Sequence, residues 1–67
     1  MLKELIKNAK KEIIKNNKEF EYVAGDLEIA AQVWHGYLTP SQRVNVMKQH
    51  GITKSIIDCY RAIAGMF

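Results

Sequence analysis

The segment of residues 39–64 carries the strongest structural signals in this chain of 67 residues. A proline stands between Thr39 and Gln42, at what would be the first position of a helix. The spacing of Thr39 and Gln42 is that of a capping box, in which each side chain accepts a hydrogen bond from the other residue's free backbone N–H group. Gly51 then interrupts the pattern, as a helix-ending glycine does. The segment therefore predicts two short helices, at residues 39–50 and 53–65.

The second of these helices has the most regular apolar stripe in the chain. Thr53 is a favourable N-cap residue, because its hydroxyl can accept a hydrogen bond from a backbone N–H group of the first helical turn. The apolar residues that follow recur at helical spacing and predict a face that packs on the core. They are Ile56, Ile57, Tyr60, Ile63, Ala64 and Phe67.

The helix at residues 39–50 has a weaker apolar face. We expect Val44, Val46 and Met47 to point inward. The polar residues that should remain in solvent are Arg43, Lys48 and Gln49.

The N-terminal part of the chain predicts an amphipathic helix at residues 2–20. Its apolar residues fall within one arc when successive residues advance by about 100°, and its lysines occupy the remaining surface. The apolar residues are Leu2, Leu5, Ile6, Ala9, Ile13 and Phe20. We interpret this face as part of the core, since so small a protein needs each amphipathic helix to build one.

A further helix is predicted at residues 26–36. Gly25 would end the preceding helix in the left-handed conformation, and Asp26 would act as the N-cap of the next one. This helix has little polar surface, so it should be the most buried, with Trp34 as its largest core residue. Its apolar residues are Leu27, Ala30, Ala31, Val33, Trp34 and Tyr37.

These signals predict a single all-α domain, a compact bundle of four helices whose last two form a pair. Strand signals such as period-two alternation and Asn-Gly turns are absent from the sequence. No apolar run approaches the roughly 18 residues that a membrane span needs, and no signal peptide is recognisable. One cysteine, Cys59, agrees with a reducing compartment, so we expect a cytoplasmic protein.

The residues do not favour an enzyme or a metalloprotein. The only imidazole and thiol groups belong to His35, His50 and Cys59, and their spacing matches no zinc motif. Neither a nucleophile motif nor a glycine-rich phosphate loop is present in the sequence. We therefore expect no catalytic residues, no metal and no cofactor.

The net charge of +3 hides an uneven distribution. Residues 1–20 contain six lysines and three glutamates, for a balance of +3, and residues 21–38 contain three acids and no base, for −3. Residues 39–67 contain four bases and one acid, for +3. Such a chain is compatible with a polyanionic partner.

The residues around Gly51 resemble the helix-turn-helix family of DNA-binding motifs. Gly51 matches the turn glycine of that family, Ile52 the buried residue of the turn, and Ile57 and Tyr60 the residues that pack the second helix on the domain. The resemblance covers about 20 residues, 43–62. It implies that the helix from Thr53 enters the major groove of duplex DNA.

The resemblance implies a small DNA-binding protein, such as a transcriptional regulator. We expect it to act as a homodimer, because one small domain with few basic contacts would bind DNA weakly. Hydroxyl and ammonium groups at the start of the second helix would contact phosphates or the edges of the nucleobases. Arginine and lysine side chains on both helices would contact further phosphates. The candidate DNA-binding residues are Arg43, Lys48, Thr53, Lys54, Ser55 and Arg61.

The alternative is an adaptor or inhibitor that binds another protein, of the kind that a phage or another mobile element encodes. It would act through an exposed apolar patch or through the basic first helix. The candidate residues on that helix are Lys7, Lys11 and Lys15.

Overall fold

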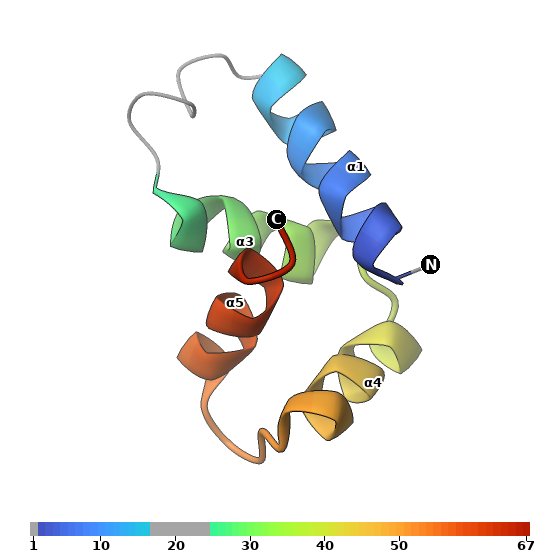
Figure 1. The fold of residues 1–67 in the computed structure, drawn as a ribbon, viewed down its shortest axis with the longest axis vertical. Helices are drawn as coiled ribbons and strands as arrows, with labels where there is room; N and C mark the ends of the chain where they lie inside the picture. The colour runs from blue at the N-terminus through green and yellow to red at the C-terminus, as the bar shows by residue number, and fades with distance from the viewer. Residues whose placement is uncertain (1, 17–24) are drawn as a thin grey trace.

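The computed structural model describes residues 2–16 and 25–67. Within these ranges the chain forms four helices and no strand, which confirms the all-α class. In Figure 1 these helices are labelled α1, α3, α4 and α5. Their bounds are Leu2–Asn16 for α1, Asp26–Gly36 for α3, Pro40–His50 for α4 and Ile56–Ala64 for α5.

Helix α3 lies in the middle of the fold. It packs against α1 on one side and more extensively against α5 on the other, and α4 contacts α5 (Figure 1). The core residues come from all four helices and from the α3–α4 connection. They are Ile6, Ala9, Ile13, Ile29, Ala30, Val33, Trp34, Leu38, Val46, Cys59 and Ile63.

Helix α1 buries a narrower face than the sequence predicted. Ile6, Ala9 and Ile13 are buried at helical spacing, as expected, but Leu5 lies at the edge of this face and is 38% exposed. Ile14, which falls outside the apolar arc, packs against the core as a partly buried residue. The predicted continuation from residue 17 to residue 20, including Phe20, lies outside the described residues.

Helix α3 has the predicted bounds but a different N-cap residue. Gly25 is its N-cap, with φ of −70°, so the left-handed Gly25 and the capping Asp26 that we expected are both wrong. Trp34 is buried, as predicted. Ile29, which the sequence analysis did not place in the core, is buried too. Leu27 in the first turn is instead 43% exposed.

Helix α4 confirms the capping box. The Thr39 hydroxyl accepts a hydrogen bond from the Gln42 backbone N–H at 3.2 Å, and the Thr39 N–H donates to the Gln42 side chain at 2.9 Å. The predicted inner face was partly wrong, since Val46 is fully buried but Val44 is exposed. Residues two apart on a helix point in different directions, so the two valines cannot both face the core.

Helix α5 begins later than predicted. Its first residue is Ile56 and its N-cap is Ser55, so the predicted start and cap at Thr53 are wrong. Cys59 and Ile63, four residues apart, are the buried residues of the helix. Ile57 faces away from them, and Ile56 lies in the first turn, at the free end of the helix. Both isoleucines are therefore exposed, against the prediction.

Candidate functional site

The turn between α4 and α5 is fixed by a left-handed glycine. Gly51 has φ of 64° and ψ of 29°, a conformation that costs glycine little and other residues more. The Ile52 N–H donates to the Met47 carbonyl at 2.9 Å and so satisfies a free carbonyl of the last turn of α4. Ile52 is half-buried against the core. The chain thus leaves α4 along a defined path and reaches α5 after five connecting residues, 51–55.

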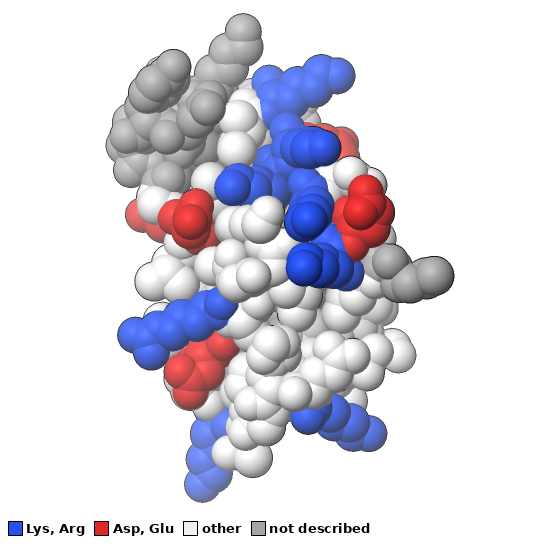
Figure 2. Space-filling view, in the orientation of Figure 1, with Lys and Arg blue, Asp and Glu red and all other residues white. Residues whose placement is uncertain are grey.

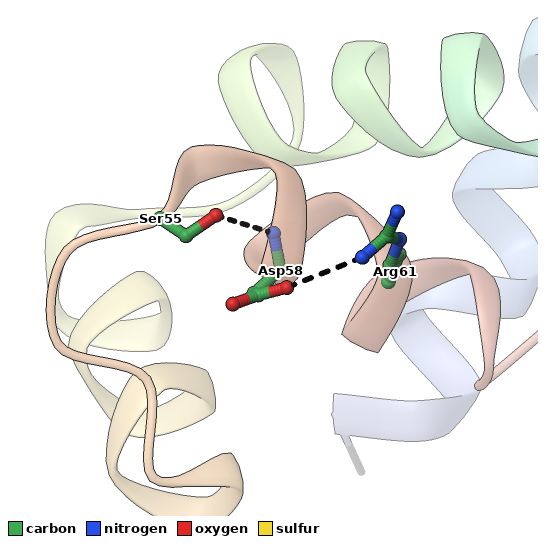
Figure 3. Close-up of polar contacts among 3 residues, drawn as sticks. All are labelled: Ser55, Asp58 and Arg61. Carbon is green, nitrogen blue, oxygen red and sulfur yellow. Dashed lines mark hydrogen bonds and ion pairs between the residues drawn. The ribbon is translucent and has the colours of Figure 1, made fainter.

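The start of α5 is exposed to solvent. Every residue from Thr53 to Asp58 is exposed, whereas Cys59 and Ile63 hold the later turns in the core. Figure 3 shows the Ser55 hydroxyl, which accepts a hydrogen bond from the Asp58 N–H at 3.2 Å. The N-terminus of α5 is therefore capped by a side chain and remains accessible to a partner.

Asp58 and Arg61 form an ion pair along the exposed face of α5 (Figure 3). Their charged groups are 3.5 Å apart, and the two side chains are 53% and 67% exposed. A pair so exposed adds little to stability. Its main effect is local, because the carboxylate offsets part of the positive charge that Arg61 brings to this surface.

The candidate DNA-binding residues do not all occupy equivalent positions. Thr53, Lys54 and Ser55 are exposed, but they lie in the turn before α5 and not in its first helical turn. Lys48 is exposed near the end of α4. Arg43 is half-buried, and its Nε is buried without a hydrogen-bond partner among the residues that the structure describes. The expectation that Arg43 stays in solvent is therefore wrong, whereas Gln49 is exposed as expected.

The lysines of α1 form a separate basic surface. Lys11 and Lys15 are exposed and Lys7 is half-buried. Figure 2 shows blue side chains gathered over α1, apart from the blue side chains near α4 and α5 in the lower half of the view. A largely uncharged surface separates the two groups on this face. The positive charge is thus divided between two regions.

Three large apolar side chains are exposed on the α4–α5 pair. Val44 is 50% exposed, and Ile56 and Ile57 are nearly as exposed. We expected all three in the core, because apolar residues at helical spacing usually face inward. Their exposure adds an apolar component next to Lys48 and Lys54 that sequence reasoning missed.

A further polar contact joins two helices. The His35 Nε2 and the Tyr60 hydroxyl are 2.6 Å apart and link α3 to α5. Burial raises the pKa of the Cys59 thiol, and the nearby Asp58 carboxylate raises this pKa further. The thiol is therefore protonated near neutral pH and a poor nucleophile.

No group of three or more His, Cys, Asp or Glu side chains within residues 2–16 and 25–67 is arranged to hold a metal ion. None of the helices in the described part of the chain is long and apolar enough to cross a membrane. Comparisons with protein-family models, curated proteins and solved structures found no match to this chain.

Proposed function

We propose that this chain binds duplex DNA through the α4–α5 turn and the start of α5, in the manner of a helix-turn-helix protein. The observation that supports the proposal is the unbroken exposure of residues 53–58, at the free end of a helix whose later turns are anchored by Cys59 and Ile63. A helix held in this way can place its N-terminal end in the major groove while the domain stays on the outside of the duplex.

The chemistry of this end suits phosphate contacts. Lys54 supplies an ammonium group, Thr53 a hydroxyl, and the N-terminus of α5 the positive end of a helix dipole. Lys48 and Arg61 add positive charge on either side of the turn. Because Asp58 offsets Arg61, we expect binding that depends mainly on phosphates and discriminates weakly between sequences.

A fluorescence titration with a labelled generic duplex, repeated at several salt concentrations, tests this proposal. The affinity should fall steeply with rising salt, because each phosphate contact releases a counterion. Lys54→Glu should weaken binding at least about tenfold and make the salt dependence shallower by about one unit of log–log slope.

Lys15→Glu is the matched control, because it makes the same charge change on the exposed side of α1. Its effect should be much smaller than that of Lys54→Glu. Equal losses for the two variants would mean that net charge, and not the start of α5, governs binding. No binding at low salt would remove the DNA proposal altogether.

The exposure of Val44, Ile56 and Ile57 favours a second candidate function, the binding of another protein. An adaptor or inhibitor would use this apolar surface or the lysines of α1. Reversal of Lys7, Lys11 and Lys15 to glutamate should release a captured partner if α1 forms the interface. Retention of the partner by this triple variant, with release by Ile57→Asp, would assign the interface to α5.

A further inference from the structure

Two adjoining hollows lie along the α4–α5 pair, and we call them together the groove. The first, of about 590 Å³, lies between the turn and α5, and the second, of about 510 Å³, lies between α4 and the start of α1. Both are lined by His50, Gly65 and Met66, so the two hollows adjoin each other. The groove therefore reaches from the turn, past the end of α5, to the first residues of α1.

The groove combines an apolar lining with a positive margin. Ile52, Ala62 and Met66 contribute partly buried apolar side chains, and Gly65 contributes none that would fill the space. The charged groups of the lining are Lys3, Lys54 and Arg61 against Asp58, a balance of three positive charges and one negative charge. A complementary partner would present an apolar side chain flanked by carboxylates.

The first turn of α3 has this composition. Asp26, Leu27 and Glu28 are consecutive and exposed, and 43% of Leu27 is accessible. We call these three residues the acidic knob. They belong to the segment with a negative charge balance, residues 21–38, whereas the residues that line the groove come from the two positively charged segments, 1–20 and 39–67.

We propose that the chain associates with itself, with the acidic knob of one copy seated in the groove of another. Leu27 contacts the apolar lining, while Asp26 and Glu28 lie near the positive margin. The contact joins two different surfaces and is therefore heterologous, so further copies can add until a ring closes. Since the charges on both surfaces are exposed, the association is weak and sensitive to salt.

Sedimentation velocity at low salt, over a range of protein concentrations and without DNA, tests this proposal. The mass of the wild-type chain should rise above the monomer value of 7.7 kDa as its concentration increases. The knob variant Asp26→Lys/Glu28→Lys and the groove variant Lys3→Glu/Lys54→Glu should each associate at least about tenfold more weakly. An equimolar mixture of the two variants should recover association, because their altered charges complement each other.

The control is Lys7→Glu/Lys11→Glu, which changes the charge by as much as the groove variant does but lies outside the groove. It should associate like the wild type. Because lysines are unfavourable at the start of a helix, Leu27→Gln provides a second knob variant should the first unfold, and it should also weaken association.

Three results would overturn the proposal: a wild-type monomer at every concentration, knob variants that associate like the wild type, or a mixture that stays monomeric. The proposal does not depend on DNA binding. Association is measured without DNA. A chain that does not self-associate could still bind DNA, and a chain that does not bind DNA could still self-associate.

Discussion

Tyr60 and His35 connect α5 to α3 through a contact between residues 25 positions apart in sequence. Their rings meet edge to face, with centroids 5.7 Å apart and an angle of 74° between the planes. The hydroxyl and the imidazole nitrogen form a hydrogen bond in the same arrangement. This pair supports the orientation of α5, and so the position of its exposed end.

Tyr60→Phe should lower the free energy of unfolding by about 0.5 to 1 kcal/mol, because it removes the hydrogen bond and keeps the ring contact. Urea denaturation would measure this change. Tyr37→Phe is the control, since it removes a hydroxyl from an exposed tyrosine and should have little effect. Equal stabilities of the Tyr60→Phe variant and the wild type would show that the hydrogen bond contributes nothing.

For the helices, the sequence predicted the bounds better than it predicted which residues of each helix are buried. Thr39 and Gln42 specify the start of α4 by a local interaction, and Gly51 specifies its end, so neither depends on the rest of the fold. The start of α5 was misplaced because Thr53 and Ser55 are both good N-cap residues. Only the path of the turn selects Ser55.

Which face of a helix is buried depends on the helices that it packs against. The sequence of one helix does not show which helices these are. Ile56 has the right spacing from Cys59 and Ile63 to face the core, but it lies at the free end of α5. Leu27 likewise lies in the first turn of its helix, α3, and is exposed. The exposed apolar residues of the candidate surfaces therefore could not be distinguished in the sequence from core residues, because both have the same helical spacing.

Gly51→Ala tests the conformation of the turn. The variant should lose about 1 kcal/mol of stability, because alanine is disfavoured at a φ of 64° even though no atom lies within 4 Å of the added Cβ. Gly36→Ala is the matched control, with equally open space and no positive φ. Thermal unfolding should show Gly36→Ala at or above wild-type stability, and a Gly51→Ala variant as stable as the control would contradict the left-handed turn.

At the scale of the whole molecule, the distribution of charge distinguishes three surfaces. Lys7, Lys11 and Lys15 of α1 form one, the groove and the turn form a second, and the acidic knob forms the third. Lys54 and Arg61 belong both to the groove and to the proposed DNA-binding surface. DNA and a second copy of the chain would therefore compete for the same positive charges.

The central proposal is that the exposed start of α5 and the preceding turn meet the DNA. Amide chemical-shift mapping of the ¹⁵N-labelled chain during titration with a generic duplex tests it most directly, because the amide signals of each helix and turn are followed separately. We expect the largest shift changes at residues 51–58 and at Lys48, with small changes along α1. Changes concentrated on α1, with residues 51–58 unaffected, would contradict it.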